Sequence, residues 1–118
     1  MDERAAVGRY GEDLAVRYLE DLGLRIMARN WRCRTGELDI IAVDGGCLVF
    51  CEVKTRRSAA FGPPQAAVTT AKLARLRKLA ALWLDQQDES WPAIRLDVVA
   101  VTRGAVGPAT IEHFHAVG

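Results

Sequence analysis

Residues 36–56 have the sequence GELDIIAVDGGCLVFCEVKTR, in which two apolar runs flank the turn sequence Asp44-Gly45-Gly46. A glycine pair between two apolar runs is typical of a tight β-hairpin, because such turns need positive φ angles that glycine adopts without strain. We therefore predict two antiparallel strands, one at Glu37–Val43 and one at Cys47–Lys54.

The register of this hairpin would gather charged side chains. With the two glycines at the centre of the turn, Asp39 lies opposite Glu52, and Glu37 lies opposite Lys54. Alternation along each strand then puts all four side chains on one face. Carboxylates directly opposite one another destabilise a sheet unless something compensates their charge. Because hard cations bind through one or two carboxylates, we predict a Mg²⁺ site at Asp39 and Glu52, with Mn²⁺ as the alternative ion.

Lys54 is predicted to act on the water that attacks a phosphate. It lies two residues beyond Glu52, on the same face of the strand, where an ammonium group can orient or deprotonate water or stabilise growing negative charge. The simpler interpretation is a solvated strand end, with Glu37 and Lys54 as a surface ion pair worth under about 1 kcal/mol. The combination of both acidic motifs across one tight turn favours a site.

The remaining pattern predicts a single mixed α/β domain over residues 1–118, with the order αβββαββ. Apolar residues at helical spacing predict two amphipathic helices, and apolar runs between turn residues predict the strands. Besides the hairpin, the predicted elements are a helix at Ala5–Leu22, a strand at Leu24–Arg32, a loop at Ser58–Pro64, a helix at Gln65–Gln86, and strands at Ile94–Thr102 and Thr110–Phe114. Because the second helix connects two strands, we expect a parallel crossover and a central mixed sheet flanked by helices on both faces.

Composition excludes several other classes of protein. No long uninterrupted apolar run indicates a membrane span or an export signal, so we place the protein in the cytoplasm. Three cysteines without C-x-x-C spacing argue against a disulfide framework or a zinc site and are expected in the core. His113 and His115 alternate near the C-terminus and are interpreted as surface residues. No nucleophile elbow or Ser/His constellation supports a small-molecule hydrolase.

A basic segment overlaps the end of the hairpin and continues beyond it, since no acidic residue lies between Val53 and Leu84. Arg56 and Arg57 follow the metal-binding strand directly, and we expect them to contact nucleic acid near a phosphate at the metal. Three further cations lie about one turn apart on the second predicted helix: Lys72, Arg75 and Lys78. For these three, contact with a phosphate backbone and an ordinary solvated helix face are equally compatible with the pattern.

Several motifs of this chain match a known family. The main ones are GELDIIA at residues 36–42 and VFCEVKTR at residues 49–56, and the further matches are Gly11-Glu12, Gly62-Pro63, Lys72 and Arg95–Val99. In these motifs the chain resembles the YraN family of bacterial endonuclease-like proteins. The resemblance implies a restriction-endonuclease-like fold, related to archaeal Holliday junction resolvases and other PD-(D/E)XK nucleases. Leu38 stands where the name of that motif has proline, and the GE-x-D form is usual for the family.

The resemblance also implies roles for individual residues. Asp39 and Glu52 would be metal ligands together with the Val53 carbonyl, and Lys54 would lie beside the attacking water. Glu12 would complete the metal site from the first helix. Independently, Glu12 lies on the inward stripe of that helix, although the helix dipole alone also favours a carboxylate near the N-terminus.

Glu37 is the fourth acid that we include in the catalytic group. Two roles are open for it: a carboxylate behind the metal ligands, or a partner that holds Lys54.

We therefore expect a Mg²⁺-dependent endonuclease that hydrolyses phosphodiester bonds in DNA, with branched or structured DNA among its substrates and a role in repair or recombination. The alternative is a module of the same fold that binds nucleic acid or protein without catalysis. Intact Asp39, Glu52 and Lys54 favour the enzyme. Because resolvase-like relatives act as dimers, a homodimer is among the expected assemblies.

Overall fold

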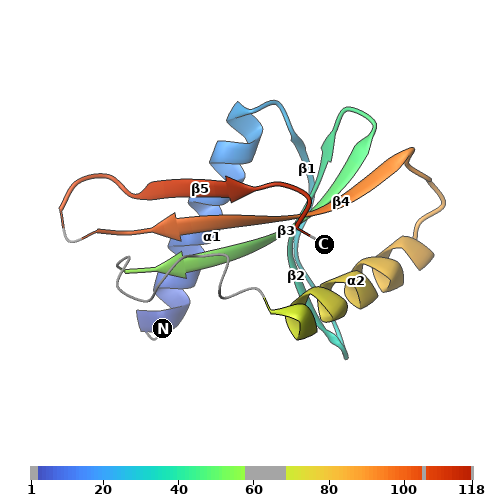
Figure 1. Ribbon diagram of the computed structural model, residues 1–118, viewed down its shortest axis with the longest axis horizontal. Helices are drawn as coiled ribbons and strands as arrows, with labels where there is room; N and C mark the ends of the chain where they lie inside the picture. Colours follow the sequence, from blue (N-terminus) through green and yellow to red (C-terminus); the bar gives the residue numbers. More distant parts are fainter. Residues whose placement is uncertain (1–2, 58–68, 105, 118) are drawn as a thin grey trace.

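A five-stranded mixed sheet with one helix on each face forms the protein (Figure 1). This computed structural model describes residues 3–57, 69–104 and 106–117. The elements are α1 (Glu3–Asp21), β1 (Arg25–Cys33), β2 (Gly36–Asp44), β3 (Cys47–Arg56), α2 (Thr70–Asp85), β4 (Ala93–Thr102) and β5 (Thr110–Phe114). The strands lie side by side in the order β1-β2-β3-β4-β5, with β3 and β4 parallel and the other neighbours antiparallel. The predicted element order and the parallel crossover are confirmed.

The start of α2 differs from its prediction. Thr69 is extended and caps the helix, because its hydroxyl accepts a hydrogen bond from the Lys72 amide at 3.2 Å. The helix therefore begins at Thr70 instead of Gln65. The loop predicted at Ser58–Pro64 and the first residues of the predicted helix lie outside the described residues. Within the described ranges, no helix is long and apolar enough to cross a membrane.

Two apolar clusters hold the helices against the sheet. The cluster under α1 includes Ala15, Leu19, Ile40, Val49 and Val99. The cluster under α2 includes Ile41, Phe50, Leu76, Leu79 and Trp83. Adjacent residues of β2 and β3 thus face opposite helices, as the two-residue period of a strand requires. Both faces of the sheet are covered, as predicted.

The three cysteines are free thiols, and they sit in or beside these clusters. Cys51 is buried, whereas Cys33 and Cys47 are half-buried. The expectation that they serve as core residues is confirmed for Cys51, whereas Cys33 and Cys47 lie at the edges of the clusters.

Gly11 allows α1 to approach β3 very closely. A Cβ atom at this position would overlap the side chain of Thr55. The missing side chain therefore sets the distance between the helix and the sheet, and it brings the neighbouring Glu12 against β1.

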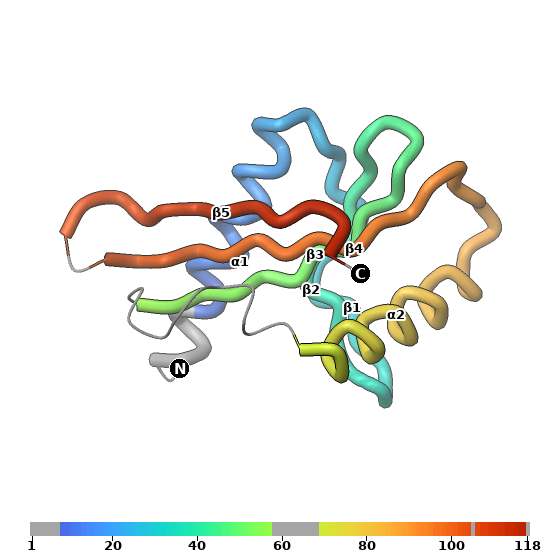
Figure 2. The backbone as a smooth tube through the Cα atoms, viewed as in Figure 1, coloured from blue at the N-terminus to red at the C-terminus, as the bar shows by residue number. Residues whose placement is uncertain are grey.

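The strands β2 and β3 are paired only near their turn. Their pairing runs from Asp44–Cys47 to Ile40–Cys51, in the predicted register. Beyond that point β2 remains paired with β1 as far as Gly36, whereas β3 remains paired with β4 as far as Arg56. Figure 2 shows β1 and β2 turning toward α2 while β3 continues beside β4. The predicted backbone pairs of Asp39 with Glu52 and of Glu37 with Lys54 are therefore wrong, because each strand follows its other neighbour.

Candidate active site

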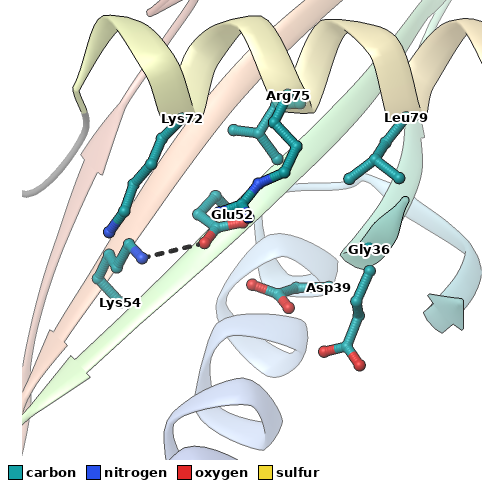
Figure 3. A pocket seen from close by; sticks show the side chains of 9 residues that line it. Gly36, Asp39, Glu52, Lys54, Lys72, Arg75 and Leu79 are labelled. Atoms are coloured by element: carbon teal, nitrogen blue, oxygen red, sulfur yellow. Dashed lines mark ion pairs between the residues drawn. The ribbon is translucent and has the colours of Figure 1, made fainter. Parts of the chain in front are cut away.

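A cavity of about 250 Å³ lies between α2 and the diverging parts of β2 and β3. Its lining residues are Gly36, Glu37, Asp39, Glu52, Lys54, Lys72, Arg75, Leu76 and Leu79. Figure 3 shows the two acids and the lysine of the strands on one side, with Lys72 and Arg75 descending from α2. The four charged residues predicted to share one face of the hairpin thus line one cavity, although their strands have separated.

Asp39 bridges the gap between the two strands. The Val53 N–H donates to its Oδ2 at 2.8 Å, which replaces a main-chain bond that continued pairing would have provided. Burial, followed by the negative charges of Glu52, Glu37 and Glu12, raises the pKa of Asp39 to about 7, against the opposing effect of the Val53 amide. A cation beside Asp39 would favour its ionised form.

Lys54 forms an ion pair with Glu52 inside this cavity. Its Nζ lies 3.1 Å from Oε1 of Glu52, and the two side chains are 26% and 20% exposed. Burial lowers the pKa of Lys54, but the charge of Glu52 and its hydrogen bond raise it more, so the net shift is upward. Lys54 therefore keeps its proton at neutral pH. It can stabilise negative charge and orient a water, whereas it is poorly suited to take a proton.

Lys72 on α2 lies beside Lys54. A hydrogen bond with Lys54 and the charge of that lysine lower the pKa of Lys72. Arg75 follows one turn later and lines the same wall of the cavity. An anion would stabilise the neighbouring positive charges of Lys72 and Lys54. This wall of the cavity is therefore suited to a phosphate group.

Glu12 is buried, with 9% of its surface exposed, as its inward position on the helix suggested. Its Oε1 accepts hydrogen bonds from Arg29 Nε at 3.0 Å and from Asn30 Nδ2 at 2.8 Å, both on β1. Asn30 has a φ of 54°, a conformation that asparagine tolerates better than most residues. Sequence reasoning missed these two partners, and the asparagine within a strand was the one available signal. Glu12 acts on Asp39 through its charge.

Glu37 pairs with β1. Its Oε2 accepts from Arg32 Nε at 2.6 Å, and the two residues are partners in the β1–β2 register. Of its two candidate roles, holding Lys54 does not fit, because Lys54 pairs with Glu52. Glu37 instead contributes negative charge near Asp39.

The other predicted nucleic-acid contacts lie outside the lining of the cavity. Arg56 ends β3 and Arg57 follows it, while Lys78 is exposed on α2. These three are described residues that do not line the cavity, in contrast to Lys72 and Arg75.

The donor set at Asp39 and Glu52 fits a hard divalent cation. Both residues offer carboxylate oxygens, the ligands that Mg²⁺ and Mn²⁺ prefer. Asp39 touches β3 at Val53, whose carbonyl was the third expected ligand. Within the described ranges, the carboxylates of Glu12, Asp39 and Glu52 do not all lie within 4.8 Å of one another. Glu12 would have to leave Arg29 and Asn30 to join the other two.

One prediction about the histidines is wrong. His113 was expected at the surface, but its side chain is 3% exposed and its Nε2 lies 2.7 Å from Oδ2 of Asp97. The reason is that Asp97 is fully buried on β4 and takes a polar partner from the adjacent strand β5. The His115 side chain is 59% exposed, as predicted.

Comparison with known proteins gives the family. Residues 11–101 match the model described as "Uncharacterised protein family UPF0102". The UPF0102 protein of Beutenbergia cavernae is 55% identical over 118 residues, which is 100% of both chains. The UPF0102 protein of Kineococcus radiotolerans is 55% identical over 113 residues, 95% of this chain and 93% of the relative. That of Streptomyces griseus is 52% identical over 118 residues, 99% of each chain. The chain therefore belongs to the UPF0102 family, and the family part of the resemblance drawn from its motifs is confirmed.

Proposed function

We propose that this protein is a metal-dependent endonuclease that hydrolyses phosphodiester bonds in DNA, built on a restriction-endonuclease-like core. The observation that carries the proposal is the pair Asp39 and Glu52 at the point where β2 and β3 separate, with Lys54 hydrogen-bonded to Glu52. Two acids and a lysine around one cavity match the carboxylates and the cation that phosphodiester hydrolysis requires.

The surroundings of Asp39 support a bound cation. An asparagine could accept the Val53 hydrogen bond equally well without a buried charge. The aspartate instead lies in a site where burial and, after it, the charges of three other acids raise its pKa to about 7. A bound cation would offset the cost of ionising Asp39 beside other carboxylates. The fold alone does not require this cluster of acids, so the cluster supports a cation site. When bound, Mg²⁺ would polarise a phosphate oxygen and supply a water of lowered pKa.

The residues of the chain divide the remaining work. Asp39 and Glu52 hold the ion, and Lys54 orients Glu52 through the 3.1 Å ion pair. Because Lys54 stays protonated, it stabilises the negative charge that grows on the phosphate during attack. Lys72 and Arg75 bind a neighbouring phosphate of the same strand from the opposite wall.

Such an enzyme would act in the cytoplasm on chromosomal DNA, in repair or recombination, as a monomer or as a homodimer. A catalytically inactive binding module of the same fold is the competing interpretation. The retained carboxylates speak against it, since DNA binding alone would be weakened by acids in the groove.

The decisive experiment compares the parent with Asp39→Asn, Glu52→Gln and Lys54→Ala on flap, junction, single-stranded and linear duplex DNA, each in Mg²⁺ and in Mn²⁺. We expect cleavage by the parent alone and DNA binding by all four proteins. Asp21→Asn, which changes an exposed acid at the end of α1, is the control and should cleave normally. Equal cleavage by the parent and Asp39→Asn would reveal a contaminant and overturn the proposal. DNA binding by the parent without cleavage in either ion would favour the inactive module.

A further inference from the structure

A second group of ligating side chains lies on the opposite face of the sheet from the cavity. Asp97 on β4 is the register partner of Cys51, which belongs to the cluster under α1. Its Oδ2 is 2.7 Å from His113 Nε2 and 3.8 Å from His115 Nδ1. The three ligand atoms all lie within 4.8 Å of one another, and among the described residues no other His, Cys, Asp or Glu trio does so.

We propose that Asp97, His113 and His115 bind a divalent transition-metal ion of the Zn²⁺ type. Two imidazoles and one carboxylate are borderline ligands that suit Zn²⁺ and its late first-row neighbours. Ligands at roughly 2.0–2.1 Å in tetrahedral geometry lie roughly 3.3 Å apart, so the 2.7 Å and 3.8 Å distances from Asp97 Oδ2 to the two histidines need shifts of about half an ångström. The two imidazole rings are stacked, with centroids 3.8 Å apart and an angle of 27° between their planes, so the exposed His115 ring must also rotate to direct its nitrogen at the same ion. The exposed His115 ring leaves the site accessible from solvent.

The surroundings of His113 fit a metal ligand. Its Nδ1 lies 3.2 Å from the hydroxyl of Tyr18 on α1. Without an ion, the Nε2–H donates to Asp97 and Nδ1 accepts from the tyrosine. With an ion on Nε2, the proton sits on Nδ1 and donates to the tyrosine oxygen, so both tautomers are satisfied. Metal-binding histidines nearly always have such a partner on the second nitrogen.

Asp97 is held in place by donors from the protein. The Ala116 N–H donates to Oδ1 at 3.0 Å, and Arg95 Nε lies 3.1 Å from both oxygens. Oδ2 remains directed at the two histidines. The carboxylate therefore needs no rearrangement of the backbone to become a ligand.

The charges nearby permit a divalent ion. Arg95 places one positive charge on Asp97, but its Nη1 also pairs with Asp44 at 3.2 Å. Two carboxylates and one guanidinium leave one net negative charge beside two imidazoles. Bound Zn²⁺ would join β4 to the C-terminal segment, next to the hydrogen bond from Val117 N to the Leu96 carbonyl at 2.8 Å. Figure 1 shows the chain after β5 turning back beside β4.

The test is a titration of the full chain with Zn²⁺ by calorimetry, and with Co²⁺ by absorption spectroscopy. A background of Asp39→Asn with Glu52→Gln removes the carboxylates of the cavity, so the proposed nuclease can fail without affecting the result. We expect one ion per chain, a rise in Tm, and a cobalt spectrum without thiolate charge transfer. His115→Gln should weaken binding at least about tenfold, and because this side chain is exposed the variant should fold.

Two further variants separate ligation from structure. Tyr18→Phe should weaken binding about tenfold, because it removes the acceptor for the His113 Nδ1–H. Glu112→Gln, an exposed change on β5 next to His113, should bind like the background protein. Equal affinity of His115→Gln and the background, the absence of any bound ion, or a thiolate signature would each overturn the proposal.

Discussion

The sheet holds two aspartates in opposite surroundings, Asp97 fully buried and Asp39 half-buried. Asp97 receives hydrogen bonds from Arg95, His113 and the Ala116 N–H, so donors reach both of its oxygens. Asp39 receives one from the Val53 N–H, and its burial together with the neighbouring acids raises its pKa to about 7. The donors around Asp97 stabilise its charge whether or not an ion is bound, whereas the negative charge of Asp39 among other acids needs a cation to compensate it.

The first prediction, with the largest expected effect, concerns the stability that Asp97 contributes through its hydrogen bonds. Asp97→Asn should lower the free energy of unfolding by about 3–5 kcal/mol, because it leaves Arg95 and His113 without their buried partner. Urea unfolding at pH 7 measures this. Asp39→Asn is the matched change and should not destabilise the metal-free protein. If Asp39→Asn lowered the free energy of unfolding more than Asp97→Asn, the proposed difference between the two aspartates would be wrong.

The second prediction concerns cleavage. Asp39→Asn should reduce the rate of DNA hydrolysis at least about 100-fold, equivalent to about 2.7 kcal/mol of transition-state stabilisation. Single-turnover assays in Mg²⁺ measure the rate. The same change should leave the affinity for DNA within about threefold, because the cations of α2 remain in place. A parallel loss of binding would mean that Asp39 supports the groove and not the chemistry.

The third prediction tests the close approach of α1 to the sheet at Gly11, which places Glu12 near Asp39. Gly11→Ala should destabilise the protein by about 1–3 kcal/mol, because the new methyl group overlaps Thr55 and pushes the helix away. Gly8→Ala, in the same helix with open space around it, should be neutral or stabilising by up to about 1 kcal/mol. Thermal unfolding compares the two variants. Equal Tm values would show that α1 shifts without cost.

Local pattern accounts for what was predictable in the fold and in the cavity. The glycines of the turn set the register from Asp44–Cys47 onward, and strand alternation put Asp39, Glu52 and Lys54 toward the same cavity. The separation of β2 from β3 was not predictable, because it depends on β1 and β4, which pair with them from distant parts of the chain.

Several contacts that sequence reasoning missed join residues that are distant in the chain. His113 lies 16 residues from Asp97 and 95 residues from Tyr18, and the partners of Glu12 lie 17 and 18 residues away. No local period relates such positions, so a histidine near the C-terminus resembled a surface residue.

The fourth prediction concerns pH. The folded chain retains the Asp39 proton up to a pH of about 7, whereas the unfolded chain loses it near 3.8. The folded state therefore binds more protons in this window, and its stability should fall as the pH rises through it. In metal-free buffer we expect a loss of about 1–3 kcal/mol relative to Asp39→Asn between pH 4 and pH 7. Added Mg²⁺ should reduce the loss. Parallel stability curves for the two proteins would contradict the raised pKa.

The smallest expected effect separates the cations of α2. Lys72 lines the cavity beside Lys54, whereas Lys78 on the same helix does not. Lys72→Ala should raise the KM for DNA about two- to fivefold at low salt with little change in kcat, since it removes one phosphate contact at a site that solvent ions can screen. Lys78→Ala should change KM less. The difference between the two variants should shrink as the salt concentration rises, because screening weakens the charge that Lys72 contributes. An equal effect of both lysines would indicate that α2 attracts DNA by its overall charge, and that the position beside Lys54 has no special part in binding.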